Sequence, residues 1–257
     1  MLDFAIQTAR DAGRILAERF GRASLQVQHK GDINLVTEAD LAAERLIVER
    51  IRSYYPRHAI LTEEAGDVTR AAAGDAAYKW IIDPLDGTTN YAHGYPCFCV
   101  SIGLEYEGAL VLGVIYDPAR DELFAAERGG GATLNGRAIR VSEVSDLNRA
   151  LLCTGFPYDV RERGDFARHF TSFIMHAQGV RRDGSAALDL AYVACGRFEG
   201  FWEEGLQPWD VAAGVVIVEE AGGRVSRYDG TPVNIYAAPF MCSNGLVHDQ
   251  MMRVLAR

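Results

Sequence analysis

The chain has 257 residues, of which 49% are hydrophobic and 24% are charged, and its formal net charge at pH 7 is -9. This length can bury a sizeable core, either as one large domain or as two small ones. The negative charge argues against a nucleic-acid surface, which needs a basic stripe, and no apolar run reaches the length of a membrane span. An acidic protein can still bind an anionic substrate if a metal ion supplies positive charge locally.

The five cysteines predict a protein of a reducing compartment. Their number is odd and no CxxC pair is present, so we expect free thiols and a cytoplasmic location. Cys97 and Cys99 alternate along a predicted strand, which favours core packing over metal binding. The amino-terminal segment carries Asp3 and lacks a basic start before an apolar block, so a helix is expected there and not a secretion signal.

Helices and then strands are expected in the first half of the chain. Apolar residues spaced three and four apart predict an amphipathic helix from residue 2 to about residue 20, ended by Gly21. A second helix is expected at 38–54, before Pro56. Five strand-like segments follow, and the turn residues between them predict an antiparallel meander. These segments are residues 59–62, 79–83, 97–106, 109–117 and 122–127.

The glycines at 129–131 lack the strand–loop–helix context of a phosphate loop, so they are read as a hairpin turn. Strands and helices alternate in the second half, before a terminal helix. The strands are expected at 151–156, 198–203 and 239–244, and the helices at 165–177, 184–196 and 209–223. No linker or repeat separates the halves. We therefore predict one α/β domain, residues 1–257, with helices and strands in layers and two lobes of about 1–145 and 146–257.

Four acidic positions stand where predicted elements end. They are Glu63 (followed by Glu64), Asp83, Asp86 in the turn after its strand, and Asp210 at the start of the last long helix. Each has a simpler explanation when taken alone. The DPLDG segment favours a turn, and an aspartate near a helix start can cap it.

Together these carboxylates indicate a site for a hard cation. Oxygen ligands with no His or Cys cluster nearby in sequence select ions such as Mg²⁺, and a carboxylate pair at one strand end can hold two ions. Gly87 would let the backbone approach a ligand, and the amides of a turn that enters a helix can bind phosphate oxygens. Metal ions beside such amides provide the charge neutralisation that phosphoryl transfer needs.

Three segments resemble the signatures of the inositol monophosphatase family. They are the Glu63-Glu64 pair, WIIDPLDGTTN at 80–90 and PWDVAAGVVIVEEAGG at 208–223, and their order and spacing fit that family over nearly the whole chain. The resemblance implies a layered αβαβα sandwich of the inositol monophosphatase and fructose-1,6-bisphosphatase type. It also implies Mg²⁺ dependence with two to three ions per site, lithium sensitivity and usually a homodimer.

The resemblance assigns metal ligands residue by residue. Glu63, Asp83 and the backbone carbonyl of Leu85 resemble the ligands of a first metal. Asp83, Asp86 and Asp210 resemble those of a second metal. A third, weaker Mg²⁺ site is expected near Glu63.

The resemblance also assigns catalytic roles. Thr88 would hydrogen-bond the attacking water, and Asp40 would accept the proton of that hydroxyl. Asp40 also matches a capping box in TEAD, and we expect the two roles to compete because one side chain would have to satisfy both geometries. Water activated by metal, Glu63 and Thr88 would attack phosphorus without a covalent enzyme intermediate. Lys30 lies in a segment that forms a mobile loop near the third metal in the family, or is an ordinary exposed lysine.

Substrate contacts follow from the same resemblance. The amides of Gly87 and Thr88 would hold the phosphate, and Asp86 is expected near a ring hydroxyl. Glu203 resembles the residue that hydrogen-bonds the inositol ring hydroxyls, with a solvent-facing acid at a strand end as the alternative. The segment Gly184, Ser185 and Ala186 resembles the loop that closes over the ring in the family, with the amide of Ala186 as a hydrogen-bond donor.

The resemblance therefore implies an inositol-phosphate phosphatase, a phosphoric monoester hydrolase that converts myo-inositol 1-phosphate to inositol and phosphate. Relatives with the same core cleave fructose 1,6-bisphosphate, histidinol phosphate or the 3′-phosphate of adenosine 3′,5′-bisphosphate, and Glu203 with the 184–186 loop favours inositol. The alternative of another class is a regulatory role, because some similar bacterial proteins bind protein partners in transcription antitermination and ribosome assembly. No nucleic acid or membrane is expected as a direct partner.

Overall fold

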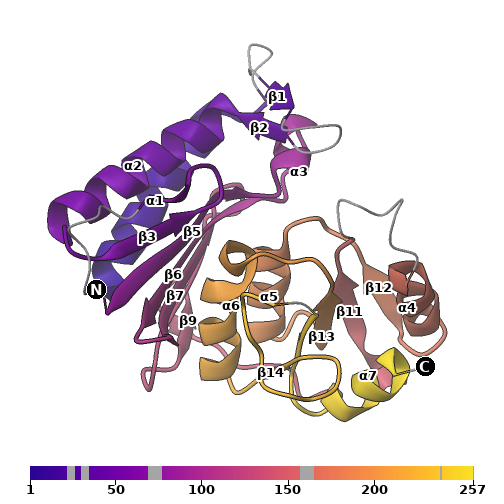
Figure 1. Cartoon of the computed structure of the whole chain (residues 1–257). Helices are drawn as coiled ribbons and strands as arrows, with labels where there is room; N and C mark the ends of the chain where they lie inside the picture. Colours follow the sequence, from indigo (N-terminus) through magenta and orange to yellow (C-terminus); the bar gives the residue numbers. More distant parts are fainter. Residues whose placement is uncertain (22–26, 30–34, 69–76, 157–164, 238, 257) are drawn as a thin grey trace.

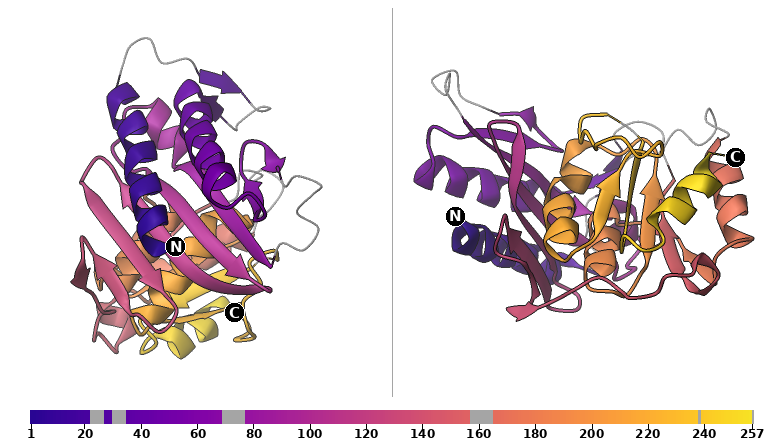
Figure 2. Two further views of the ribbon diagram at one scale, coloured as in Figure 1. Left: turned by 90° about the vertical axis from the view of Figure 1, so that its left-hand side faces the viewer. Right: turned by 90° about the horizontal axis from the view of Figure 1, so that it is seen from below.

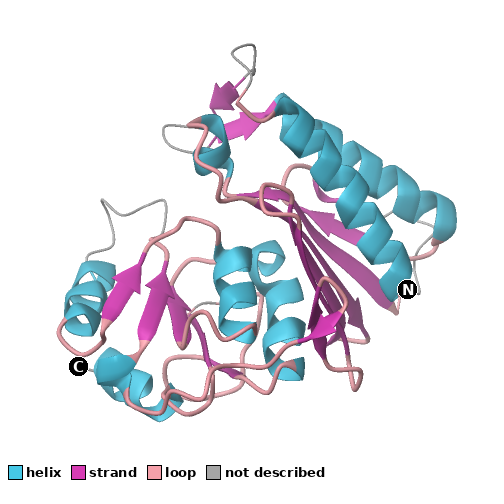
Figure 3. Cartoon of the chain, turned by 180° about the vertical axis from the view of Figure 1, so that it is seen from behind, coloured by secondary structure: helices cyan, strands magenta, loops and turns pink. Residues whose placement is uncertain are grey.

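Helices and sheets alternate in five layers in the computed structural model, which describes residues 1–21, 27–29, 35–68, 77–156, 165–237 and 239–256 (Figure 1). Lys30 lies outside these described residues. Two helices form the first layer, two lie between the sheets and two cover the far face of the second sheet (Figures 1 and 3). In that order they are α1 (Leu2–Arg19), α2 (Glu38–Tyr54), α5 (Ala186–Ala194), α6 (Pro208–Glu220), α4 (Asp165–Ile174) and α7 (His248–Leu255). The predicted αβαβα arrangement is confirmed.

Small residues let the first helix pair lie close to the large sheet. Helix α1 buries Ala5, Ala9 and Ala12, spaced three and four apart, as an amphipathic helix does. A side chain at Gly13 would collide with the ring of Tyr116, because an added Cβ would lie 2.5 Å from it. Helices α1 and α2 lie side by side on this face of the sheet (Figure 2).

The large sheet has eight strands in the order β10-β9-β8-β7-β6-β5-β3-β4. Strands β5 to β8 form the predicted antiparallel meander, which β9 and β10 extend. The prediction that residues 59–62 belong to this antiparallel run is wrong, because β3 pairs with β5 in parallel. Residues 129–131 join the paired strands β8 and β9, which confirms the hairpin. The strands are β3 (Ala59–Thr62), β4 (Gly66–Asp67), β5 (Tyr78–Asp86), β6 (Cys99–Tyr106), β7 (Ala109–Asp117), β8 (Glu122–Glu127), β9 (Ala132–Leu134) and β10 (Arg137–Ala138). A separate two-stranded sheet pairs β1 (Val27–His29) with β2 (Leu35–Thr37).

The second sheet has five strands in the order β12-β11-β13-β15-β14. They are β11 (Leu151–Thr154), β12 (Gly179–Arg181), β13 (Gly200–Glu203), β14 (Arg224–Ser226) and β15 (Phe240–Ser243). Helix α6 is apolar on all sides because strands of both sheets contact it. Gly113 permits this packing, since an added Cβ would lie 2.2 Å from the carbonyl oxygen of Ala213.

All five cysteines are free, and four of them are buried. Cys97 precedes β6 instead of lying on it, so the prediction that it alternates with Cys99 on one strand is wrong. Both side chains nevertheless pack in the same core, as expected. No helix in the described part of the chain is long and apolar enough to cross a membrane.

Candidate active site

The predicted site residues meet at the carboxyl ends of strands from both sheets, where open α/β sheets commonly bind ligands. A cavity of about 400 Å³ opens there. Every predicted metal and substrate residue lines it, and only Asp40 of the predicted set lies behind its wall. The lining includes Glu63, Asp83, Leu85, Asp86, Gly87, Thr88, Gly184, Ser185, Ala186, Glu203 and Asp210.

A bulge in β5 brings two carboxylates to the cavity from one strand. The register with β6 shifts between Asp83 and Asp86, and Pro84 lies in this irregular stretch, which is where a sheet tolerates proline. The prediction that Asp86 belongs to a turn is therefore wrong, because β5 continues to Asp86. Gly87 follows with φ +91, and an added Cβ would lie 2.7 Å from the carbonyl oxygen of Cys97. This position therefore requires glycine, because any other residue would place a Cβ against the neighbouring backbone in a strained conformation.

Asp40 serves two partners at once. Its Oδ2 accepts hydrogen bonds from the amide (2.9 Å) and hydroxyl of Thr37, which completes the capping box of α2. Its Oδ1 accepts one from Thr88 Oγ1 at 3.3 Å. The expectation that one side chain could not satisfy both geometries is wrong, because Asp40 caps α2 with one carboxylate oxygen and contacts Thr88 with the other. The catalytic role of Asp40 stays a prediction. Burial raises the pKa of Asp40 to about 6, although the Thr37 hydrogen bonds oppose the shift.

The carboxylates repel one another across the cavity. Burial raises the pKa of Asp83 well above its ordinary value, and the charges of Glu63, Asp86 and Asp210 raise it further. Burial and the Asp86 charge act in the same way on the pKa of Asp210. Such a cluster is costly unless a cation lies among its members.

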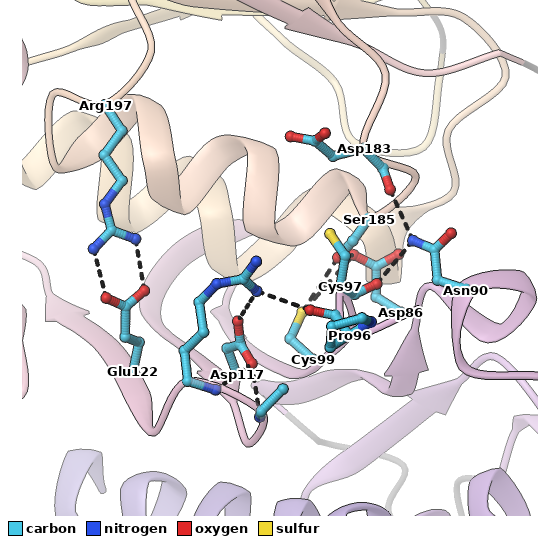
Figure 4. Close-up of polar contacts among 12 residues, drawn as sticks. Asp86, Asn90, Pro96, Cys97, Cys99, Asp117, Glu122, Asp183, Ser185 and Arg197 are labelled. Carbon is cyan, nitrogen blue, oxygen red and sulfur yellow. Dashed lines mark hydrogen bonds and ion pairs between the residues drawn. The ribbon is translucent and has the colours of Figure 1, made fainter. Parts of the chain in front are cut away.

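Asp86 is held by the loop that precedes α5 (Figure 4). Its Oδ2 accepts hydrogen bonds from Ser185 Oγ at 2.6 Å and from the amide of Ala187 at 2.8 Å. Asn90 fixes the same loop, because its Nδ2 donates to the carbonyl oxygen of Asp183 at 2.8 Å. Asn90 lies in the WIIDPLDGTTN segment, but the sequence analysis assigned it no role.

Several proposed metal ligands accept hydrogen bonds from neighbouring groups. Within the described ranges, no three His, Cys, Asp or Glu side chains are arranged so that they could hold an ion as they stand. Asp83 Oδ1 accepts from the amide of Leu85 at 2.9 Å, and the Leu85 carbonyl accepts from Thr88 Oγ1 at 3.0 Å. The donor set still fits a hard cation, because it consists of oxygens whose mutual repulsion a divalent ion would relieve. The assignment of metal ligands stays a prediction.

The far wall of the cavity holds Glu203. Burial raises the pKa of Glu203 to about 8, and the charge of Arg182 opposes this shift. The carboxylate lies over Gly155, where an added Cβ would come within 2.0 Å of Glu203 Oε2. Arg182 also lines the cavity, and its guanidinium carbon lies 5.4 Å from the centroid of the Phe156 ring. Glu203 is thus a wall residue of the cavity and not a solvent-facing acid.

Asp189 also lines the cavity, although its sequence context did not predict it as a site residue. This residue lies in α5, one turn after Ser185. Its Oδ1 is buried and has no hydrogen-bond partner among the described residues. Its neighbours in the AALDLAYVA segment are mostly apolar, so the sequence pattern predicts only a buried helix. A single acidic residue in such a helix is the one feature that could have indicated a site residue.

Comparisons with known proteins agree with this geometry. The model of the inositol monophosphatase family matches residues 1–257. The chain is 47% identical over 257 residues to an inositol-1-monophosphatase of Synechocystis, covering 99% of this chain and 88% of that protein. It is also 47% identical over 235 residues to the Nus factor SuhB of Pseudomonas aeruginosa, covering 90% of this chain and 86% of that protein. The solved inositol monophosphatase of Anabaena is 49% identical, with a TM-score of 0.90 over 99% of this chain and 94% of that one.

Proposed function

The chain belongs to the inositol monophosphatase family, and from this premise we propose that it is a Mg²⁺-dependent phosphatase whose substrate is myo-inositol 1-phosphate. The observation that carries the proposal is the meeting of four carboxylates in one cavity with the backbone of Gly87 and Thr88. Family membership supports phosphatase activity. The metal, the number of ions and the substrate are our inference.

The residues on one wall of the cavity would bind the metal ions and activate the attacking water. Two to three Mg²⁺ ions, held by the side chains of Glu63, Asp83, Asp86 and Asp210 and by the Leu85 carbonyl, would neutralise the phosphate charge and the leaving oxygen. The Thr88 hydroxyl has one proton, which can point to the Leu85 carbonyl at 3.0 Å or to Asp40 at 3.3 Å. When the Leu85 carbonyl is taken up by an ion, the proton would point to Asp40 and the lone pairs of Thr88 would accept a hydrogen bond from the attacking water. Asp40 then receives the proton that Thr88 gives up.

The remaining groups orient the substrate. The amides of Gly87 and Thr88 would hold phosphate oxygens. Glu203 and the 184–186 loop lie on the other wall, where a polyol would extend from the phosphate. A panel of phosphomonoesters ranked by kcat/KM in saturating Mg²⁺ tests the substrate. We expect myo-inositol 1-phosphate to rank first, and a hundredfold preference for histidinol phosphate would overturn this choice.

A second candidate function is regulatory binding of protein partners in transcription. It is favoured by the relatives named Nus factor SuhB, among them the one in Pseudomonas aeruginosa. Complementation of a strain that needs this chain, using an Asp83→Asn variant, separates the two functions. Rescue by an inactive variant would show that binding is the needed activity, and failure to rescue would show that hydrolysis is.

We also infer a cytoplasmic homodimer that lithium inhibits. The five free thiols support a reducing compartment. The contacts of α5 and α6 with strands of both sheets support a single domain. Light scattering would test the dimer, and inhibition of turnover by Li⁺ would test the ion sensitivity.

A further inference from the structure

The Asp189 carboxyl has no evident role in the proposed reaction. Its side chain is only 1% exposed, yet it belongs to the wall of the cavity. Oδ1 has no hydrogen-bond partner among the described residues. A buried polar atom without a partner costs about 1–3 kcal/mol, so a carboxyl retained in this condition calls for a partner that arrives later.

The surroundings of Asp189 make the acid costly. Helix α5 is otherwise apolar and buried from Ala187 to Ala194. Burial raises the pKa of Asp189 well above its ordinary value, and the charges of Asp183 and Glu203 add to this shift. A hydrogen bond with the Cys153 side chain opposes the shift but leaves Oδ1 without a partner among the described residues. A leucine of similar size would avoid that cost, so packing alone does not explain the residue.

The position of Asp189 indicates the partner. Asp189 follows the 184–186 loop by one turn and lines the cavity together with Glu203, on the wall along which a polyol would extend. The charges of Asp183, Glu203 and Asp86 all raise its pKa. Ser185, one turn earlier on the same helix, already binds Asp86. A substrate hydroxyl can both donate and accept, which suits a carboxyl in either protonation state.

We propose that Asp189 is a specificity-determining residue that hydrogen-bonds a hydroxyl of the substrate polyol, beside the hydroxyl bound by Glu203. This inference rests on the proposed function, because it assumes a polyol phosphate in the cavity. Asp189 and Glu203 would then each hydrogen-bond one hydroxyl of the same ring. A site that hydrogen-bonds a substrate hydroxyl rejects esters that lack it, because its buried polar groups stay unpaired.

The test compares the wild type with Asp189→Leu and Asp189→Asn. Steady-state kinetics give kcat/KM for myo-inositol 1-phosphate and for p-nitrophenyl phosphate, whose alcohol carries no further hydroxyl. We expect Asp189→Leu to lower the ratio of the two kcat/KM values about tenfold, mainly through KM, which corresponds to about 1.4 kcal/mol. Asn retains an acceptor and a donor, so it should keep the ratio within about threefold of wild type.

A matched control is Asp117→Asn. Asp117 is also a buried acid, but its carboxylate is satisfied by the amide of Ala119 and by Arg120, outside the cavity lining. Its replacement should leave the ratio unchanged. An unchanged ratio in Asp189→Leu, with or without a general loss of activity, would overturn the proposal. If wild type does not cleave myo-inositol 1-phosphate, the substrate proposal fails separately, and the best polyol phosphate of the panel replaces it in the ratio.

Discussion

Thr88 and Asp40 are joined by a hydrogen bond of 3.3 Å between the threonine hydroxyl and one carboxylate oxygen, while the other oxygen of Asp40 caps α2. Residues far apart in the chain are thereby fixed to each other at the cavity wall. The start of α2 consequently sets the position of the proposed proton acceptor. The helix cap and the proposed catalytic role therefore depend on the same side chain.

Replacing Asp40 should therefore reduce both properties. Asp40→Ala removes the partner of Thr88, and we expect kcat to fall at least about hundredfold, within the range of general acid–base effects. It also removes half of the capping box, with a loss of about 1 kcal/mol in the free energy of unfolding. Thr37→Ala is the control, since it weakens the cap by a similar amount and leaves Thr88 its partner. Equal kcat values for the two variants would contradict the catalytic role.

Magnesium should stabilise the fold, because it relieves repulsion among the carboxylates. At a concentration one hundred times its Kd, a bound ion adds about 2.7 kcal/mol. For a chain of this size, we expect the midpoint of thermal unfolding to rise by about 5–10 °C. Removal of the ion with a chelator should reverse the shift.

The Asp83→Asn replacement should stabilise the metal-free protein and weaken its response to Mg²⁺. A carboxyl whose folded-state pKa is raised destabilises the fold above that pKa, so the neutral amide should raise the unfolding midpoint of the metal-free protein. The same variant should show little response to Mg²⁺ and lose at least about hundredfold in kcat. A wild-type response to Mg²⁺ in this variant would remove Asp83 from the ligand set.

Gly155 should affect the KM for the polyol phosphate, because its lack of a side chain leaves room for the Glu203 carboxylate. Gly155→Ala places a methyl group within 2.0 Å of Glu203 Oε2, so the carboxylate must move. We expect KM for the polyol phosphate to rise about tenfold, the effect of one lost hydrogen bond. In a Glu203→Ala background the change should have no further effect, as a double-mutant cycle would show. Gly179→Ala, whose Cβ would meet its neighbours only at 3.4 Å, is the control, and equal effects of Gly155→Ala in both backgrounds would refute the coupling.

His248 should make stability fall in mild acid. Its two ring nitrogens lie 2.8 Å from the hydroxyls of Ser226 and Ser243, and burial, with the charge of Arg224, lowers its pKa to about 4. The unfolded chain, with a histidine pKa of about 6.5, binds more protons between these two values, so stability falls as the pH falls through this window. From pH 8 to pH 5 this group should remove about 2 kcal/mol.

Denaturant unfolding of the wild type and His248→Gln at both pH values measures this loss. The difference in stability between the two proteins should shrink by about 2 kcal/mol at pH 5, because glutamine does not titrate. Parallel curves at the two pH values would show that His248 is not held neutral in the fold.

Strong periodic patterns made much of the fold predictable. The bounds of α2 and of strands β3, β7 and β8 agree with the sequence analysis, since each has a clear apolar pattern and a turn or proline after it. The continuation of β5 through Pro84 was not foreseeable, because proline interrupts a ladder except at a bulge, and only the pairing with β6 reveals the bulge. Strands as short as β12 and β14 carry too few residues for a pattern.

The site was predictable as far as it depends on motifs. Asp83, Asp86 and Asp210 lie in long, ordered segments, and the structure brings them to one cavity. Asp189 and Gly155 stand in stretches that read as core helix and strand end. Their relation to Glu203 depends on how the second sheet packs against α5, which no spacing along the chain expresses.

The central claim is that the carboxylates from β3, β5 and α6 enclose divalent ions that bind the phosphate of the substrate. Diffraction from crystals grown with Mn²⁺ and phosphate, recorded at a wavelength where manganese scatters anomalously, tests it directly. We predict anomalous peaks within bonding distance of Asp83 and of its neighbours Glu63, Asp86 or Asp210, and their loss in Asp83→Asn. A cavity without such peaks, or the same peaks in the variant, would contradict the account.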